Sequence, residues 1–220
     1  MGQLINLLKH YPASKRPIDG RAASMTDEHR AIASQFGESY FDGDRQTGYG
    51  GYHYHPRFWR KTAELLIEHY GLSQDSSVLD IGCAKGFLLY ELKDLLPDIS
   101  IKGVDISNYA IDHAKEEVKP FLSVGNAKSL PFDTNSFDLV IAINVLHSLD
   151  QDECIAGFQE ITRVRKQFSF VVNDAWHTNE EKNRLMQWNL TGKTFMHVDD
   201  WEKFFAEIGY DGDYWWFIAE

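Results

Sequence analysis

The feature that most constrains the fold is an apolar run that breaks into a glycine-containing turn, Val78-Leu79-Asp80-Ile81-Gly82-Cys83-Ala84-Lys85-Gly86. A helix-like pattern, Phe87 to Leu92, follows at once. Strand, tight loop and helix in this order are typical of the first crossover of a doubly wound sheet. Because ligands of such sheets bind outside the carboxyl ends of the strands, the turn predicts a site for a nucleotide-like ligand.

The residue types in this turn indicate which ligand it takes. A dinucleotide fingerprint, G-x-G-x-x-G, needs its middle glycine so that backbone amides can approach a pyrophosphate. Here only Gly82 and Gly86 are glycines. Asp80, at the strand end, would repel a pyrophosphate but attract the ammonium and sulfonium groups of S-adenosylmethionine. The sequence therefore favours S-adenosylmethionine as cofactor over the dinucleotide of a nicotinamide-dependent oxidoreductase.

A second carboxylate strengthens this interpretation. Asp105 ends the next predicted strand, about 20 residues after the turn, which is the separation at which a carboxylate meets the ribose hydroxyls of an adenosine ligand. The turn alone would be equally compatible with a purely structural connection. With Asp105 in place, a ligand site is the better explanation.

Composition excludes several other classes of protein. The chain has 220 residues, 43% of them hydrophobic, which is enough for one α/β domain with additions. Its net charge of -11 argues against a nucleic-acid partner. Two cysteines make no disulfide framework, so a reducing cytoplasm is expected. No apolar run approaches the ~18 residues of a membrane span, and no signal peptide is evident, so we expect a soluble protein without a membrane partner.

Hydrophobic periodicity predicts a Rossmann-like, doubly wound and mostly parallel sheet with helices on both faces. The predicted helices are Pro56 to Tyr70, about Lys85 to Leu96, Ser107 to about Val118, Asn179 to Trp188 and Val198 to Ile208. The predicted strands are Val78 to Ile81, Ile101 to Ile106, Phe121 to Gly125, Phe137 to Ile143, Phe168 to Val172 and Tyr214 to Ile218.

The residues before this domain divide into two parts. Residues 1–37 mix prolines, glycines and charges and predict an irregular extension with one or two helices. Residues 40–55 alternate aromatics and glycines, which predicts a lid over the ligand, with Tyr49, Tyr52 and Tyr54 helping to enclose it; a loop packed on the core is the alternative. We therefore divide the chain into residues 1–55, extension and lid, and residues 56–220, the cofactor-binding domain.

Four segments, 78–86, 103–105, 126–132 and 137–149, resemble the successive motifs of class I S-adenosylmethionine-dependent methyltransferases in order and spacing. The lid also resembles small bacterial methyltransferases found with surface-polysaccharide or secondary-metabolite genes. The family resemblance implies cofactor roles for Asp80, Gly82, Gly86, Asp105, Asn126 and Asn144. Cys83 and Ile106 complete the predicted cofactor site, with Asn126 at the adenine edge and Ala127 leaving room for the ring.

Three departures from the family pattern stand out. Ala84 and Lys85 occupy the turn where many members have a central glycine, and Asn126 stands where an aspartate is commoner. The chain also ends in one clear strand where the family usually has a pair. The first two departures bear on cofactor affinity and the third on the outer edge of the sheet.

Methyl transfer from a sulfonium is an in-line displacement, so the protein must align nucleophile and methyl carbon and exclude water. A hydroxyl acceptor also needs a base. His147 and His177 both follow strand ends on the predicted site side, and Asp174 is placed to orient a histidine or to act itself. The alternative for His147 is a helix-start residue bonded to backbone, and this sequence favours that role over catalysis.

Metal chemistry has little support in the sequence. His53 and His55 lack a third nearby ligand, and Asn173-Asp174 beside Asn144 lacks the carboxylate set of metal-dependent O-methyltransferases, so no metal is expected. The prediction is a cytosolic methyltransferase acting on a small polar acceptor, most plausibly a hydroxyl of a sugar or related metabolite. An N-methyltransferase and a non-catalytic, cofactor-binding regulatory protein remain open alternatives, as does the oligomeric state.

Overall fold

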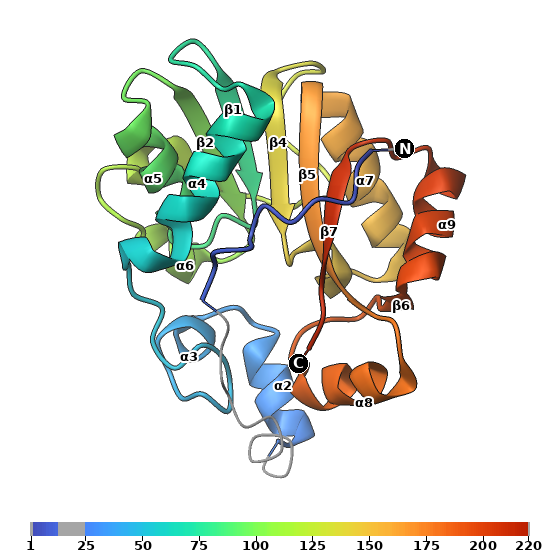
Figure 1. The fold of residues 1–220 in the computed structure, drawn as a ribbon. Helices are drawn as coiled ribbons and strands as arrows, with labels where there is room; N and C mark the ends of the chain where they lie inside the picture. Colours follow the sequence, from blue (N-terminus) through green and yellow to red (C-terminus); the bar gives the residue numbers. More distant parts are fainter. Residues whose placement is uncertain (1, 13–24, 220) are drawn as a thin grey trace.

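The computed structural model describes residues 2–12 and 25–219, and its centre is a seven-stranded sheet of order β3-β2-β1-β4-β5-β6 with β7 paired to β5 (Figure 1). The strands are β1 (Ser77–Ile81), β2 (Ser100–Asp105), β3 (Leu122–Val124), β4 (Phe137–Ile143), β5 (Arg165–Trp176), β6 (Met196–His197) and β7 (Asp213–Phe217). All their pairings are parallel. The predicted Rossmann-like sheet is confirmed, and its strand order reverses between β1 and β4.

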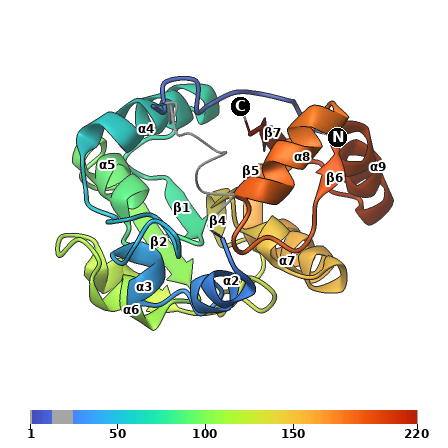
Figure 2. The same cartoon turned by 90° about the horizontal axis from the view of Figure 1, so that it is seen from below.

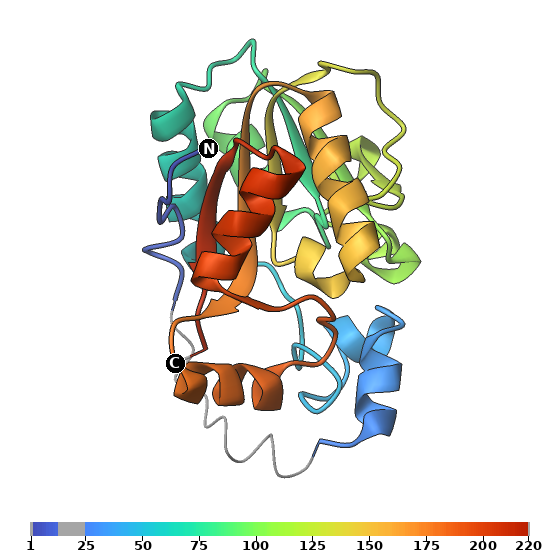
Figure 3. The same ribbon diagram turned by 90° about the vertical axis from the view of Figure 1, so that its right-hand side faces the viewer.

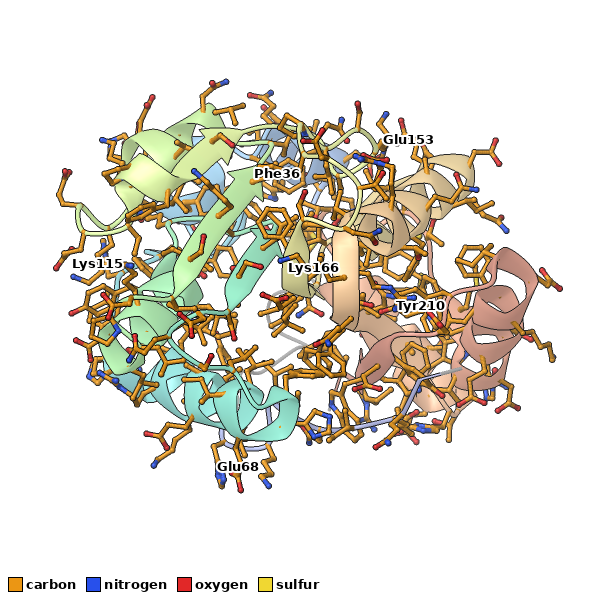
Figure 4. The ribbon with its side chains drawn as sticks, turned by 90° about the horizontal axis from the view of Figure 1, so that it is seen from above. Phe36, Glu68, Lys115, Glu153, Lys166 and Tyr210 are labelled. Atoms are coloured by element: carbon orange, nitrogen blue, oxygen red, sulfur yellow. The ribbon has the colours of Figure 1, made fainter. Side chains whose placement is uncertain are left out.

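Helices cover both faces of this sheet (Figure 3). They are α2 (Asp27–Ala33), α3 (Glu38–Phe41), α4 (Pro56–Tyr70), α5 (Phe87–Leu95), α6 (Asn108–Asp112), α7 (Gln151–Val164), α8 (Asn179–Trp188) and α9 (Val198–Ile208). Helices α4 and α7 lie on opposite faces, so Glu68 and Glu153 stand on opposite sides of the molecule (Figure 4). Helices α2, α3 and α8 instead lie beyond the carboxyl-terminal edge of the sheet (Figure 1).

Two hydrophobic cores, one on each face, hold these layers together. Strand β4 contributes to both because its side chains alternate between the faces. Leu139 and Ile141 are fully buried in the core that contains α4 and α5. Val140 and Ala142 are buried in the core that contains α7 and α9. Full burial of each large aliphatic side chain stabilises the fold by about 1.5–3 kcal/mol, which explains why this run has no polar position facing either core.

Local signals define the helix ends. Pro56 occupies the first turn of α4, where its missing amide is not needed, and the His55 ring accepts a hydrogen bond from the Arg57 amide. Gly71 ends the helix with a φ of 61°. Helix α8 begins with a capping box in which Thr178 and Glu181 each bind the other's backbone amide. His55 is therefore a helix cap.

Tertiary contacts changed the extent of several predicted elements. Helix α5 begins at Phe87 because Gly86 is left-handed, with a φ of 74°. Helix α6 ends at Asp112, well before Val118, since the Lys115 amide donates to the carbonyl of Lys85 outside the helix. Strand β3 is shorter than predicted, whereas β5 is much longer. The strand starts earlier, at Arg165, which pairs with Phe137 of β4, and it continues beyond Val172 because Asn173 and Asp174 pair with β7 and the next two residues pair with β6.

The outer edge of the sheet combines both ends of the chain. Strand β7 pairs with β5, and on its other side Tyr214 exchanges backbone hydrogen bonds with Gln3 and Ile5. Residues 3–5 therefore run beside β7, and the residues that follow cross in front of the sheet toward α4 (Figure 1). Tyr214 and Trp216 point into the core, at 3% and 5% exposed. The single long strand predicted at the end of the chain is present, and the two-residue β6 is the only other strand described after β5.

Within the predicted extension, the structure places α2 at residues 27–33, whereas residues 1 and 13–24 lie outside the described residues. The division of the chain at residue 55 stays a prediction. Among the helices of the described ranges, none is long and apolar enough to cross a membrane.

Trp201 offers a test of how α9 is fixed to the sheet. Its side chain is fully buried, and its indole N–H donates to the carbonyl of Asp174 over 3.0 Å. We expect Trp201→Phe to lower the free energy of unfolding by about 1–3 kcal/mol, because the carbonyl loses its donor. Trp201→Ala should cost about 3–5 kcal/mol through the added cavity. Urea unfolding measures both; an unchanged free energy of unfolding in Trp201→Phe would contradict a role for the N–H.

Candidate functional site

A cavity of about 630 Å³ opens at the carboxyl-terminal edge of the sheet, where the sequence predicted the ligand site. Its floor comes from the ends of β1, β2, β4 and β5, and residues from the lid, from residues 6–12 and from the loop after α8 also line it. Seen from below, α2, α3 and α8 surround this edge (Figure 2). The volume is in the range of small-molecule and cofactor sites.

Two buried carboxylates stand side by side at this edge. Parallel pairing sets Asp80 of β1 opposite Gly103, two residues before Asp105 at the end of β2. Burial, together with repulsion from Asp105, raises the pKa of Asp80 to about 8. Within the described part of the chain, no Lys, Arg or His forms an ion pair with either carboxylate. A ligand that brings positive charge to Asp80 would stabilise its ionised form.

Asp105 is oriented by the backbone. Its Oδ2 accepts a hydrogen bond from the Ala84 amide and its Oδ1 from the Ser107 amide, each over 2.8 Å. Burial raises the pKa of Asp105, and these two amides oppose the rise by stabilising the charge. The carboxylate is thus fixed in position at the cavity wall, with further lone pairs available to vicinal hydroxyls.

The turn after β1 requires its first glycine. Gly82 has a φ of 73°, and a Cβ placed there would lie 2.1 Å from Cγ2 of Val145. Ala84 also has a positive φ, 48°, and this conformation directs its amide to Asp105. A non-glycine residue in the left-handed region costs about 1–2 kcal/mol. The strain is retained at the point where the turn meets the second carboxylate.

Eight of the nine predicted cofactor residues line the cavity: Asp80, Gly82, Cys83, Asp105, Ile106, Asn126, Ala127 and Asn144. The exception is Gly86, which caps α5 and packs against Val118 and Leu122. Asn144 has a φ of 56°, and its amide donates to the carbonyl of Val172. Size, charge and donor set fit an adenosine ligand that carries an amino-acid group.

The histidine candidates separate clearly. His177 does not line the cavity; its side chain is 57% exposed and pairs with Glu181. His147 lines the cavity and is 5% exposed. The sequence favoured backbone bonding over catalysis for His147, and the Asp174 amide does donate to its Nδ1. The other candidate base, His177, instead lies outside the cavity. The reason is that α8 begins immediately after His177, and its capping box holds that residue at the surface.

His147 and Asp174 form a buried pair. The Nε2 of His147 lies 3.5 Å from Oδ2 of Asp174, and the Asp174 amide donates to Nδ1 over 3.3 Å. Since Nδ1 accepts, a neutral ring carries its proton on Nε2, facing the carboxylate. Burial raises the pKa of Asp174, and His147 opposes the rise. Both ring nitrogens are engaged, so the group with free lone pairs at the cavity is the Asp174 carboxylate.

The three lid tyrosines do not share one role. Tyr49 and Tyr52 line the cavity, and their rings lie 4.6 Å apart. Tyr54 does not line it: its hydroxyl donates to the buried Glu91 over 2.8 Å, which joins the lid to α5. A tyrosine that follows the same glycines in sequence thus belongs to the packing behind the site.

Several site residues escaped the sequence analysis. They are aromatic and come from segments far apart in the chain: Tyr11, Phe36, Tyr40, Phe41, Trp59, Trp215, Trp216 and Phe217. Burial raises the pKa of the Tyr40 hydroxyl, and Asp105 and Asp174 raise it further. The aromatic content of residues 36–41 was a signal, but nothing in the sequence showed which of them faced inward.

No group of three or more His, Cys, Asp or Glu residues with metal-binding geometry occurs in the portion of the chain described. Of the two histidines of the lid, His55 has a structural role, because its ring caps α4.

Fold and cavity together define a cofactor-binding domain of the class I methyltransferase type, and comparison with known proteins is consistent with this. Residues 78–168 match the family model described as a methyltransferase domain. Two solved structures show the same fold: the YcgJ protein of Bacillus subtilis, with a TM-score of 0.54, 21% identity and coverage of 66% of each chain, and the MccD protein, with a TM-score of 0.53, 23% identity and coverage of 67% of this chain and 69% of that one.

Among curated relatives, an uncharacterized protein of Haemophilus influenzae is 28% identical over 166 residues, which cover 69% of this chain and 64% of that protein. A malonyl-[acyl-carrier protein] O-methyltransferase of Legionella pneumophila is 35% identical over 92 residues, 40% of this chain and 31% of that enzyme. The chain thus spans less than two thirds of the length of these relatives. Residues 78–168 thus form a methyltransferase domain, and S-adenosylmethionine is the cofactor that this kind of domain uses.

The high pKa of Asp80 predicts a pH dependence of stability. Between the unfolded pKa of about 4 and the folded value of about 8, the folded protein holds a proton that the unfolded chain releases. The free energy of unfolding therefore falls as pH rises through this window, by up to about 1.4 kcal/mol per pH unit. Asp80→Asn removes this contribution. Urea unfolding of both proteins from pH 5 to 8 should show the wild type losing stability relative to the variant; parallel curves would contradict the assignment.

Proposed function

We propose that this protein transfers a methyl group from S-adenosylmethionine to a small polar acceptor, most plausibly a hydroxyl of a sugar or related metabolite. The observation that carries the proposal is the joint presence, in one cavity, of the carboxylates Asp80 and Asp105 and the buried pair His147 and Asp174. The two free, buried cysteines support a reducing, cytoplasmic location.

Each part of the cavity has a distinct task in this reaction. The cofactor supplies an electrophilic methyl group, and Asp105 and Asp80 would bind its ribose and its cationic end. Asp174 would accept the proton of the acceptor hydroxyl, while His147 orients the carboxylate through Nε2–H. The aromatic walls exclude water, so the carboxylate keeps its raised pKa and the acceptor stays aligned.

The charge of the walls narrows the acceptor class. The described residues that line the cavity include three aspartates and no lysine or arginine. An anionic acceptor would thus meet repulsion with no counter-charge from these residues. Tyr52 and Trp59 offer flat faces against which a sugar ring can pack, with hydroxyls free for Asp174. This favours a neutral acceptor and, like the net charge, disfavours a nucleic acid.

The same aspartates favour one alternative, an amine acceptor. In that case Asp174 would bind an ammonium group before the amine loses its proton, and the product would be N-methylated. The relatives named above do not decide between these acceptors. One is uncharacterized, and the other is named as an O-methyltransferase of malonyl-[acyl-carrier protein]. A panel of sugars, phenols and primary amines, assayed with cofactor carrying a labelled methyl group, distinguishes them by product.

We expect Asp174→Asn to lower the methyl-transfer rate by about 10²–10⁴-fold, the usual loss of a general base. His147→Gln should lower it by a smaller factor. The rate of the wild type should rise with pH through the raised pKa of Asp174, and this limb of the pH profile should be absent in Asp174→Asn. Steady-state kinetics at saturating cofactor measure both effects.

His177→Gln is the matched control because it removes an imidazole that lies outside the cavity, and its rate should equal that of the wild type. Isothermal titration with S-adenosylhomocysteine should give similar affinities for all these proteins. Tight binding without transfer to any acceptor of the panel would favour the non-catalytic, regulatory alternative. Loss of activity in His177→Gln alone would contradict the assignment of the base.

A further inference from the structure

The lid is joined to the cofactor turn by a partly buried ion pair. Nζ of Lys85 lies 2.6 Å from Oδ2 of Asp42, and the two side chains are 6% and 19% exposed. Lys85 is one of the two residues that replace the family's central glycine in the turn after β1. Asp42 follows α3 at the start of the lid. The departure from the family pattern therefore has a contact partner in the segment predicted to cover the ligand.

The carboxylate of Asp42 connects more than these two segments. Its Oδ2 also accepts a hydrogen bond from the Tyr109 hydroxyl of α6 over 2.8 Å, and its Oδ1 accepts from the Tyr52 amide over 3.0 Å. The lysine beside it and these donors lower the pKa of Asp42 to about 2. One carboxylate thus ties the beginning of the lid to its middle, to the cofactor turn and to the helix that follows Asp105.

Aromatic rings shield this junction. The ring of Tyr52 stacks on Phe87, the first residue of α5, with centroids 5.0 Å apart. Phe41 stacks on Tyr109 at 6.4 Å, and the Lys85 ammonium lies 5.7 Å from the Tyr109 ring centroid. Such surroundings keep water from the ion pair and strengthen its attraction. Removing one partner would leave the other charged group poorly solvated.

Lys85 does not contribute to the cavity wall, although its neighbours Ala84 and Phe87 do. Its ammonium faces Asp42, away from the bound ligand's expected position. A second tie lies close by, where the Ser107 hydroxyl donates to the carbonyl of Phe36, just before the lid. The loops that follow the two carboxylate-bearing strands are therefore both fastened to residues 36–42, at the start of the segment that covers the cavity.

We propose that Asp42 and Lys85 are a positioning pair that latches the lid onto the cofactor turn, so that the cofactor and its product leave only when this ion pair breaks. The inference rests on the proposed function for the identity of the ligand. Lid residues such as Tyr49 and Tyr52 form part of the cavity wall, so a closed lid also builds the acceptor's surroundings. Lys85 thereby supplies to this turn a contact that a glycine cannot make.

Release of S-adenosylhomocysteine, measured by stopped-flow displacement, tests the latch. We expect Asp42→Asn and Lys85→Met each to speed release by at least about tenfold, because truncating one partner of a buried, hydrogen-bonded charge pair acts mainly on the dissociation rate. The double variant should be little faster than either single variant, since both break the same contact. Tyr109→Phe, which removes one donor and no charge, should have a smaller effect.

The sign of the Asp42→Asn effect separates the latch from direct binding of the cofactor by Lys85. If the lysine bound the cofactor carboxylate, freeing it from Asp42 would slow release, and only Lys85→Met would accelerate it. That result would overturn the proposal. Asp200→Asn and Lys203→Met are matched controls, because they break an exposed pair of 2.9 Å on α9 with the same changes of charge. They should release the ligand at the wild-type rate.

Hydrogen exchange of the ligand-free protein gives a readout independent of the cofactor. Amides of the lid, residues 40–55, should exchange at least about tenfold faster in Asp42→Asn and Lys85→Met, while those of β1 and β4 keep their protection. Faster lid exchange in a protein that fails to bind S-adenosylhomocysteine would leave the latch standing and refute the cofactor site. Normal binding with unchanged release and unchanged lid exchange would refute the latch alone.

Discussion

The site depends on two carboxylates that the sheet holds side by side away from water. Burying Asp80 and Asp105 at the ends of β1 and β2 disfavours their ionised forms, and Asp80 bears the larger part of that cost. Buried carboxylates whose pKa values are raised in this way are typical of functional sites, where the charge is used. The backbone of the turn offsets part of this cost, because the amide of the strained residue Ala84 donates a hydrogen bond to Asp105. A cationic ligand, such as the proposed cofactor, would supply the rest of the compensation, so the cavity would select its ligand by charge as well as by shape.

The covering aromatics follow from the same constraint. The carboxylates retain their raised pKa values only if water is kept away, and residues 36–55 provide the cover through Phe36, Tyr40, Phe41, Tyr49 and Tyr52. These residues lie outside the sheet, so other contacts must hold them over the cavity. Polar groups of Asp42 and Ser107, surrounded by stacked rings, supply them. An ion pair consequently couples the cofactor turn to the lid, although about forty residues of chain lie between Asp42 and Lys85.

The sequence contained the parallel sheet and most of the cofactor site because both depend on short-range patterns. A few residues are enough to predict that the apolar run of β4 is a central strand and that the turn from Asp80 to Gly82 lies at the ligand cavity. The structure has both features. Helix ends also followed local caps such as Pro56 and Gly71. What could not be read were contacts set by distant segments: the length of β5, the pairing of β7 with residues 3–5, and the inward rings of Trp59 and Trp215. The position of His177 could not be predicted for the same reason, because the capping of α8 holds this residue toward solvent.

The length of β5 has a mechanistic consequence. Had the strand ended at Val172, Asp174 would lie in a loop, where its carboxylate would sample several orientations. Pairing with Phe217 of β7 instead continues the strand through Asp174, and the buried indole of Trp201 fixes the carbonyl of the same residue. The amide of Asp174 is fixed as well, because it donates to His147. His147 thereby holds both the amide and the carboxylate of Asp174, and Trp201 of α9 holds its carbonyl. If Asp174 is the base proposed above, this constraint reduces the reorganisation needed when an acceptor arrives, and the docking of α9 and β7 on the sheet would then serve the chemistry of the site as well as the stability of the fold.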